Sequence, residues 1–193
     1  VNFTFSDLLT EVDHCWYSND TYDVDRHTPC GTNLTNITWS EGKHNITIYV
    51  NDSVGNQNQT TISFTIDTVL PDINITFPIT NNSNHSDNQL EINYTRGDDV
   101  ETCWYNNDTY DKTTIIANCV NITDVTWSEG KHNLTVYAND SSNNTNFSTV
   151  SFTIDTTPPL VTIDNPPTNN SNFTNTLDIN FTFSDLLTEV DHC

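Results

Sequence analysis

Residues 127–140 read WSEGKHNLTVYAND, a run in which apolar and polar side chains alternate. Leu134, Val136 and Ala138 fall on one face of an extended chain, and Thr135 and Tyr137 fall on the other. A period of two residues is typical of a β-strand with one buried and one solvated face. The Ser-Glu-Gly that precedes it favours a turn. The run therefore predicts a strand of an antiparallel sheet, entered through a turn.

The same alternation recurs on both sides of this run. It predicts strands at 73–77, 90–94, 134–138 and 150–154, and shorter strands at 101–106, 112–116 and 120–126. No segment carries the apolar stripe of an amphipathic helix. About seven strands without helices are the pattern of an immunoglobulin-like sandwich, so we expect an all-β fold.

Two internal repeats predict the domain organisation. The segment NFTFSDLLTEVDHC at 2–15 returns unchanged at 180–193, a shift of 178 residues. Within that span WSEGKHN recurs after 88 residues, and so does SFTIDT. A period near 88 residues matches a complete small sandwich domain. We expect tandem immunoglobulin-like domains: one over 1–68 that lacks its first strand, a complete one over 69–156, and the start of a third over 157–193.

Short proline-containing segments join the expected domains, VLP at 69–71 and TPP at 157–159. Proline fixes its own backbone and holds the preceding residue extended, so these joints are predicted to be stiff. Because both ends of the sequence are the same place in a repeat, we expect one polypeptide to continue in both directions along a filament. The alternative is head-to-tail exchange of strands between separate subunits.

The chain is strongly acidic. Its 26 Asp and Glu residues against 5 Lys and Arg give a formal charge of −21. Such a chain is repelled by phosphate backbones and by anionic membrane surfaces. We therefore expect no nucleic-acid partner and no membrane contact within these residues.

A family resemblance rests on WSEGKHNLTVYANDSSNN at 127–144, on SFTIDTTPP at 151–159, and on their counterparts one repeat earlier. These runs resemble the immunoglobulin-like tandem repeats of prokaryotic surface and adhesin-like proteins, especially archaeal ones. The resemblance covers nearly all of the chain, although VLP stands at the first joint where the second has TPP. It implies an extracellular, cell-surface position and a structural or adhesive role.

Five cysteines fit one disulfide in each domain. Cys15 and Cys30 lie in the first repeat, and Cys103 and Cys119 lie in the second. Cys193 is the counterpart of Cys15, so its expected partner falls beyond residue 193. Closing a loop of ~15 residues stabilises a domain by roughly 3 kcal/mol. Bridges of this kind also indicate an oxidising, extracellular setting.

The alternative for the first pair is a zinc site. His14 and His27 stand near Cys15 and Cys30, and together they offer zinc-type ligands. The second repeat has Thr102 where the first has His14, and it has no other nearby histidine. A site that depends on imidazoles fails there, so disulfides are the preferred interpretation.

Sequons for N-glycosylation are unusually frequent. Random placement of 29 Asn and 47 Ser or Thr in 193 residues gives about 7 of them, whereas the chain has 20. Alternation on the wet face of a strand accounts for some, but sequons also crowd the loops. We expect dense N-linked glycans and no other cofactor. The acceptors are Asn2, Asn19, Asn33, Asn36, Asn45, Asn51, Asn58, Asn74, Asn81, Asn84, Asn93, Asn107, Asn121, Asn133, Asn139, Asn143, Asn146, Asn169, Asn172 and Asn180.

Calcium is a further hypothesis, because it prefers carboxylate and carbonyl oxygens. The candidate ligands are Asp67 and Asp155 at the joints and Asp52 and Asp140 in the loops before the last strands. The resemblance to adhesin arrays implies calcium at such joints. No stretch has EF-hand spacing, and a solvated acidic face is the competing interpretation.

A catalytic site is not expected. Ser40, Glu41 and His44 recur one repeat later, which favours a structural turn over a single active site. Trp16-Tyr17 and Trp104-Tyr105 follow cysteines, so we expect an aromatic ring to pack on each disulfide, with an exposed carbohydrate platform as the alternative. The sequence therefore favours a structural stalk or filament, and an adhesin that binds a host surface, another cell or glycans is the rival hypothesis.

Overall fold

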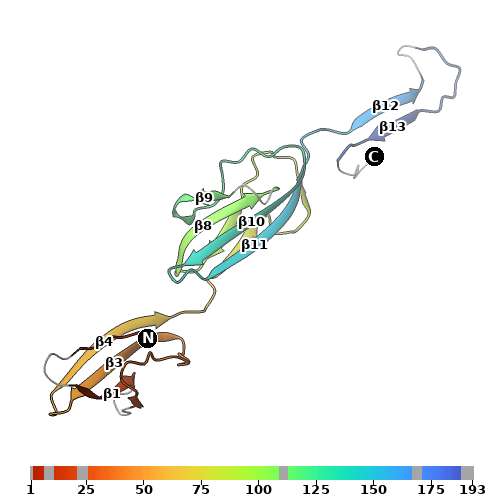
Figure 1. Ribbon diagram of the computed structural model, residues 1–193. Helices are drawn as coiled ribbons and strands as arrows, with labels where there is room; N and C mark the ends of the chain where they lie inside the picture. The colour runs from red at the N-terminus through yellow and green to blue at the C-terminus, as the bar shows by residue number, and fades with distance from the viewer. Residues whose placement is uncertain (1, 7–10, 21–25, 109–112, 167–170, 188–193) are drawn as a thin grey trace. The chain divides into compact units, whose positions relative to one another are not determined.

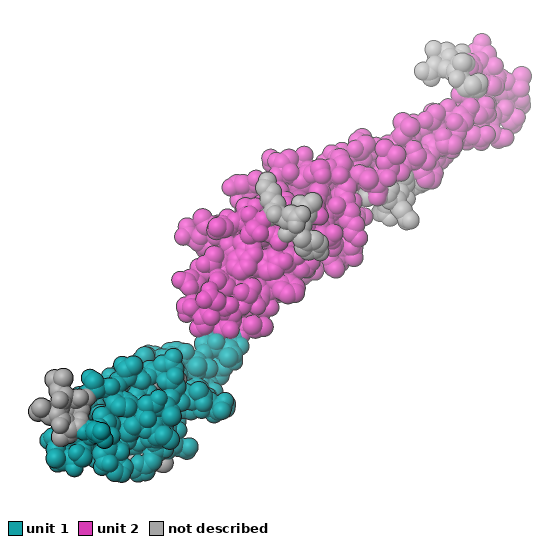
Figure 2. All heavy atoms as spheres, in the orientation of Figure 1, with its two compact units in different colours: residues 1–69 teal, residues 70–193 magenta. Residues whose placement is uncertain are grey.

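A computed structural model describes residues 2–6, 11–20, 26–108, 113–166 and 171–187. These residues form strands and one short 3₁₀ turn, η1 (Ala117–Cys119), so the expected all-β class is confirmed. None of the helical structure in these ranges has the length and apolar character needed to cross a membrane. The chain separates into two compact units, unit 1 (Val1–Val69) and unit 2 (Leu70–Cys193), which have separate colours in Figure 2.

Unit 1 is built on one antiparallel sheet in the order β2-β1-β3-β4 (Figure 1). Its strands are β1 (Val12–Asn19), β2 (Arg26–Thr28), β3 (Gly42–Asp52) and β4 (Gln57–Ile66). Ile46 and Ile48 of β3 are buried with Leu34, and Phe3 and Trp39 pack against them. The apolar residues of β3 thus form the centre of this unit's core.

Unit 2 has two sheets in its sandwich (Figure 1). The larger has the order β6-β11-β10-β8-β9, and the smaller pairs β5 with β7. The strands are β5 (Ile73–Phe77), β6 (Ser83–His85), β7 (Asn93–Arg96), β8 (Val100–Asn107), β9 (Thr114–Ile116), β10 (Gly130–Asp140) and β11 (Thr145–Ile154).

The core of unit 2 lies between these sheets. Ile73 of β5 and Tyr94 of β7 share one buried cluster with Leu134 of β10 and Phe152 of β11. Trp127 is 3% exposed and donates from its indole Nε1 to the carbonyl of Leu90 at 2.9 Å. The core therefore depends on side chains from both layers.

Residues that are 88 positions apart take the same place in the two units. His44 pairs with Phe64 in the β3–β4 ladder, and His132 pairs with Phe152 in the β10–β11 ladder. Unit 2 also contains an antiparallel hairpin of β12 (Leu160–Asn165) and β13 (Asn180–Ser184). All five residues of β13 are exposed.

Some predicted strands differ from the observed ones. β5 coincides with the prediction at 73–77, and β8, β10 and β11 extend the predictions made for them. The strand expected at 90–94 is instead Asn93–Arg96, and 120–126 holds only an isolated bridge between Ile122 and Ile92. The side chains of Ile92 and Ile122 are buried, but the backbone there does not form a continuous ladder of hydrogen bonds with a neighbouring strand. β9 begins at Thr114, and residue 112 lies outside the described residues.

Candidate functional site

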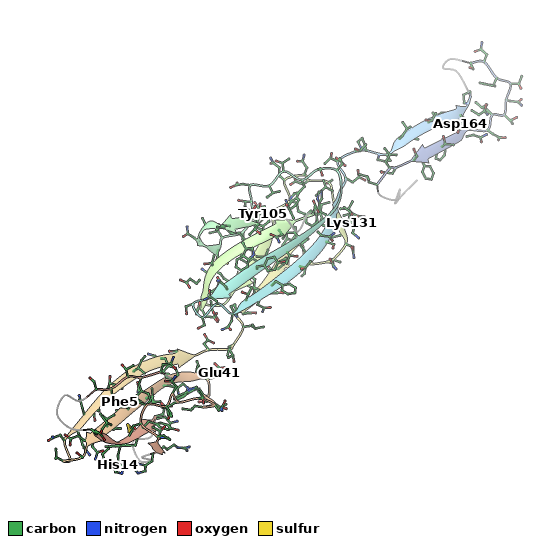
Figure 3. All side chains as sticks on the ribbon, in the orientation of Figure 1. Phe5, His14, Glu41, Tyr105, Lys131 and Asp164 are labelled. Atoms are coloured by element: carbon green, nitrogen blue, oxygen red, sulfur yellow. A yellow bond between two sulfur atoms is a disulfide. The ribbon has the colours of Figure 1, made fainter. Side chains whose placement is uncertain are left out.

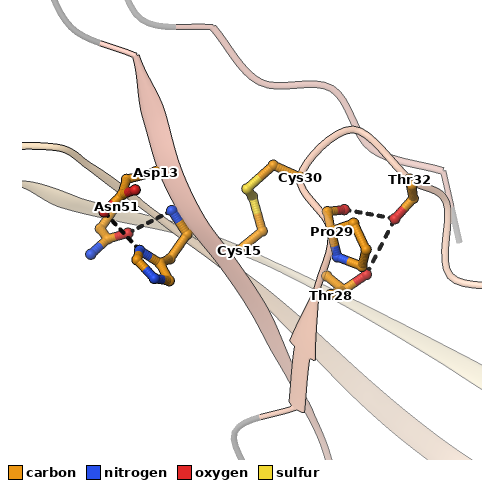
Figure 4. The surroundings of a disulfide bond; sticks show 8 residues. Asp13, Cys15, Thr28, Pro29, Cys30, Thr32 and Asn51 are labelled. Carbon is orange, nitrogen blue, oxygen red and sulfur yellow. Dashed lines mark hydrogen bonds and ion pairs between the residues drawn. A yellow bond between two sulfur atoms is a disulfide. The ribbon is translucent and has the colours of Figure 1, made fainter.

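The structure joins the cysteines in the pairs expected from their spacing. Cys15 is bonded to Cys30 (Figure 4), and Cys103 is bonded to Cys119, each pair with a Cα–Cα distance of 5.2 Å. Cys15 and Cys103 are 2% and 0% exposed, so each bridge begins inside a core. Sulfurs bonded to each other are not thiolate ligands, which removes the zinc interpretation for Cys15 and Cys30. Cys193 lies outside the described residues.

The tryptophans after the cysteines do not take the place expected of them. Successive side chains of a strand point to opposite faces, so Trp104 lies on the face opposite Cys103. Trp104 stacks on Tyr137 with ring centroids 5.4 Å apart and planes 4° apart. Trp16 stacks on Tyr49 in the same way, at 5.4 Å and 3°. The tryptophan of each Trp-Tyr pair therefore does not pack on the disulfide, because it pairs across strands on the outer face of the sheet. Tyr105, two residues after Cys103, instead packs against the core cluster that contains Cys103, as Cys119 does.

In unit 2 the stacked pair belongs to a longer row, which we call the aromatic row: Ile115, Trp104, Tyr137 and Phe147. These residues are successive partners across β9, β8, β10 and β11. Ile115 and Phe147 are 73% and 61% exposed. The rings of Tyr137 and Phe147 lie 5.8 Å apart. The row crosses the solvent face of the sheet at right angles to its strands.

In unit 1 the ends of the equivalent row are polar. His27, Trp16, Tyr49 and Gln59 are successive partners across β2, β1, β3 and β4. Gln59 stands where unit 2 has Phe147, and His27 stands where it has Ile115. The central stack is thus shared by both units, whereas the exposed apolar ends belong to unit 2.

Polar side chains cover the rest of the outer face. Thr135 and Thr149 share a hydrogen bond of 2.9 Å between their hydroxyls, and Thr47 and Thr61 do the same in unit 1. The hydroxyl of Ser151 donates to the side-chain oxygen of Asn133. This bond holds the amide by its oxygen, whereas an N-linked sugar is attached at Nδ2.

The acceptors of the sequons lie at the surface. Of the 19 that the structure describes, 13 are exposed, 6 are partly exposed and none is buried. Asn169 lies outside the described residues. Asn146 differs from Asn133 in that its Nδ2 donates to the carbonyl of Pro71 at 2.9 Å. A sugar on Asn146 requires that this contact be rearranged.

The candidate calcium ligands do not meet within a unit. The Asp140 carboxylate is 2% exposed and accepts bonds from Ser142 N, Asn144 N and Asn144 Nδ2 at 2.8–2.9 Å. The bond from the Asn144 side chain is the main cause that lowers the pKa of Asp140. Asp140 therefore organises the turn between β10 and β11, and Asp52 accepts the equivalent bonds from Val54 and Asn56 in unit 1.

Asp155 lies at the other end of β11, where its carboxylate accepts a bond from Thr157 N at 3.1 Å. Asp67 does the same for Val69 N at 3.2 Å after β4. The ten residues of β11 span about 33 Å, which separates Asp155 from Asp140. Within the described ranges, no three His, Cys, Asp or Glu side chains come together as a metal-binding group.

The repeated Ser, Glu and His residues have separate structural roles. The buried ring of His44 contacts the Asp20 carboxylate through Nδ1, and its Nε2 lies 2.7 Å from the backbone carbonyl of Ser40. These two acceptors, Asp20 first, raise the pKa of His44. The hydrogen bond with His44 also lowers the pKa of Asp20. Glu41, which is labelled in Figure 3, instead accepts hydrogen bonds from the backbone N–H and the hydroxyl of Thr68.

Unit 2 repeats this arrangement. His132 contacts Asp108, and its Nε2 lies 2.8 Å from the carbonyl of Ser128. The rings of Trp127 and Phe152 lie 5.2 and 5.5 Å from that of His132. In both units the serine contacts the histidine through its backbone carbonyl and not through its hydroxyl. The contact between the serine and the histidine is therefore a structural one. The sequence analysis does not identify the Asp partner of the histidine, although an Asn-Asp-Thr triplet recurs at the end of β1 and of β8.

A comparison with family models agrees with an immunoglobulin-like fold. A family model described as bacterial Ig-like domain (group 3) matches residues 120–191, which include β10 to β13. Fibronectin(III)-like modules of Clostridium thermocellum CbhA are similar to 78% of this chain and 82% of theirs, with 17% identity and a TM-score of 0.39. No curated protein matches the sequence.

Proposed function

We propose that this chain is a structural extracellular repeat protein that forms a densely N-glycosylated, disulfide-stabilised cell-surface stalk or filament. The observation that carries the proposal is the recurrence, after 88 residues, of one antiparallel sheet with the same strand register and an equivalent disulfide. The match to an immunoglobulin-like family agrees with a surface or structural protein. An array of such domains gives length without requiring an active site.

The chemistry of the surface supports an exposed setting. Disulfides persist in oxidising compartments, so the two bridges favour a position outside the cytoplasm. Accessible sequons on strands and turns offer sites where sugars cover sheet edges and protect the backbone. The partners we propose are neighbouring repeats of the same chain, with lateral or head-to-tail self-association.

Peptide mass spectrometry of native material tests the glycosylation. We expect glycans on peptides that contain Asn45, Asn74, Asn93, Asn133 and Asn143, and an intact mass well above the 21.8 kDa of this polypeptide segment. Asn146 is the internal control, because its Nδ2 is engaged by Pro71 and its occupancy should be lower than that of Asn133. Most of the five acceptors found unmodified would contradict the proposal.

Calcium at the joints stays a weaker part of this proposal. Asp67 and Asp155 are the ligands nearest the joints, and each already accepts a local backbone hydrogen bond. Thermal unfolding with calcium and with a chelator measures the contribution of the ion. Equal unfolding temperatures in the two conditions would remove calcium from the proposal.

An adhesin is the second candidate, and the exposed aromatic row of unit 2 favours it. Exposed aromatic rings on a flat sheet face are suited to the apolar face of a sugar ring. A glycan-binding assay with deglycosylated protein tests this role. Binding that is lost in Phe147→Gln would support the adhesin, and absence of binding to neutral and acidic glycans would leave the structural role.

A further inference from the structure

The aromatic row has the chemistry of a carbohydrate site. Its central rings are almost parallel, and Phe147 at its end is 61% exposed. One neighbouring row carries Asn106, Thr135 and Thr149, and the other carries Thr102, Asn139 and Thr145. The exposed ring of Phe147 can accept the C–H face of a sugar, and the exposed hydroxyls of Thr145 and Thr149 in the neighbouring rows can bind its hydroxyl groups.

The charge of the surface selects a neutral ligand. None of the ten residues in these three rows is charged. The chain as a whole has a formal charge of −21, so anionic ligands are repelled. A neutral sugar can pack on the rings and does not need a cationic side chain beside them.

Asn139 places an attachment point for such a sugar beside the row. It lies two residues after Tyr137 on the same face of β10, which is about 7 Å along a strand. Its cross-strand partner is Thr145, two residues before Phe147 on β11. Asn139, Tyr137 and Phe147 therefore form one corner of the outer face.

The orientation of the amide agrees with a sugar on this side. The Oδ1 atom of Asn139 is buried in the structure and has no hydrogen-bond partner. In unit 1 the equivalent Asn51 accepts a bond from His14 N at 3.0 Å through Oδ1 (Figure 4). The amide oxygen is thus hydrogen-bonded to the protein in unit 1 and is buried without a partner in unit 2, and Nδ2 is the atom to which a sugar is linked.

We propose that the N-glycan carried by Asn139 folds back onto Tyr137 and Phe147 and covers the aromatic row. This inference rests on the proposed function, since it requires that Asn139 be glycosylated. A tethered sugar has a high effective concentration at a site beside its attachment point, which favours it over a free glycan. In unit 1 the same corner is formed by Asn51, Tyr49 and Gln59, so the sugar there loses one ring contact.

The chain offers matched variants for a test in glycosylated protein from the native host. Ser141→Ala removes the sequon and leaves Asn139 itself unchanged, and Ser141 is exposed. Phe147→Gln installs the residue that unit 1 already carries at the equivalent position. We expect Ser141→Ala to lower the unfolding temperature of unit 2 in the parent protein. In protein that already carries Phe147→Gln, Ser141→Ala should lower that temperature by less than half as much.

Proton NMR of the sugars provides an independent measurement. Protons of the Asn139 sugar should be shifted upfield by the aromatic rings, relative to the same sugar on Asn143, an exposed turn residue. The shift should shrink in Phe147→Gln. Equal chemical shifts for the two sugars, or additive effects of the two substitutions, would overturn the proposal even if unit 2 unfolds at an altered temperature.

Three further outcomes separate this inference from the proposed function. If Asn139 is unmodified while other acceptors carry glycans, the packed-sugar inference is wrong and the proposed glycosylated stalk is unaffected. If all the acceptors are unmodified, both the packed-sugar inference and the proposed glycosylation are wrong. Binding of a free neutral oligosaccharide to the row of the fully glycosylated protein shows that the row is not covered, and it also overturns the inference.

Discussion

His44 is a buried residue whose two ring nitrogens both face acceptors, the Asp20 carboxylate and the Ser40 carbonyl. A neutral imidazole has only one N–H, whereas the protonated ring donates from both nitrogens. The positive ring also lies 5.1 Å from Trp39 and 5.7 Å from Phe64. These contacts favour the charged ring over the neutral one.

This pair predicts how the stability of unit 1 depends on pH. The pKa of His44 is raised in the folded state, so its contribution is complete below about 6.5, the value for an unfolded histidine. It is lost as the pH rises through the raised pKa. The pKa of Asp20 is lowered, so its contribution is lost only in acid, as the pH falls through that lowered value. Urea unfolding followed by Trp39 fluorescence over this range measures the change.

Asp20→Asn is the control for this effect, because it keeps the size of the side chain and removes its charge. The midpoint of urea unfolding should then vary less between about pH 6 and about pH 8. An unchanged pH dependence in Asp20→Asn would show that another group is responsible.

At the scale of elements, each disulfide joins the inner strand of a sheet to the segment that follows its edge strand. The bridge in unit 2 closes a separation of 16 residues between β8 and η1. In the double variant Cys103→Ser and Cys119→Ser, we expect the free energy of unfolding of unit 2 to fall by about 3 kcal/mol. Denaturant unfolding measures the loss.

Peptide mapping without reductant provides the control for the disulfides. In native protein Cys15, Cys30, Cys103 and Cys119 should resist alkylation until a reductant is added. Ready alkylation of these cysteines would contradict both the bridges and the extracellular setting.

The two faces of β11 provide a matched pair of substitutions. Phe152 is 0% exposed and lies in the core, whereas Phe147 is 61% exposed on the outer face. In protein without glycans, Phe152→Ala should destabilise unit 2 by about 3–5 kcal/mol, and Phe147→Ala by less than about 1 kcal/mol. Calorimetry compares them. Equal losses would show that the outer face is packed in the folded unit.

Periodicity located most strands because an alternating segment has one buried face. The strand Ile73–Phe77 coincides with the prediction, because Asp72 precedes its first apolar residue and Pro78 follows its last. β6 (Ser83–His85) was missed because a three-residue polar strand has no alternation of apolar residues. Its parallel pairing with β11 depends on the backbone alone.

The outer-face site was only partly predictable. The cysteine pairs follow from spacing within one domain, and the sequons are visible as triplets. The aromatic row joins residues 33 and 10 positions apart in sequence, and their alignment depends on strand register. Alternation assigns each side chain to a face but does not show which residues of neighbouring strands are partners.

At the scale of the molecule, unit 1 has an open groove where unit 2 has a strand. The groove has a volume of about 640 Å³, and its lining includes Phe3, Ile48, Val50 and Thr60. In unit 2 the residue equivalent to Thr60 is Ser148, whose hydroxyl accepts a bond from Ile75 N of β5 at 3.1 Å. A strand like β5 therefore has a matching place on unit 1.

β12 is a second strand of this kind. Ile163 pairs with Phe181 as Ile75 pairs with Tyr94 in the β5–β7 sheet. Val161 and Ile163, which share one face of β12, are 66% and 61% exposed, so the apolar face of the hairpin is not buried by the residues described. We expect a sheet like that of unit 1 to cover the apolar face of β12. Burial of apolar side chains in that contact would stabilise both the hairpin and the sheet.

We expect the covering strands to belong to one continuous polypeptide, with about 178 residues for each pair of domains, the period of the sequence repeat. The segment at 2–15 recurs unchanged at 180–193, which agrees with a repeat that runs along one chain. Native filaments that are deglycosylated and reduced should run in denaturing electrophoresis far above the 21.8 kDa of this segment. A discrete band near that mass would instead show separate subunits joined by exchanged strands, with β12 of one copy in the groove of the next.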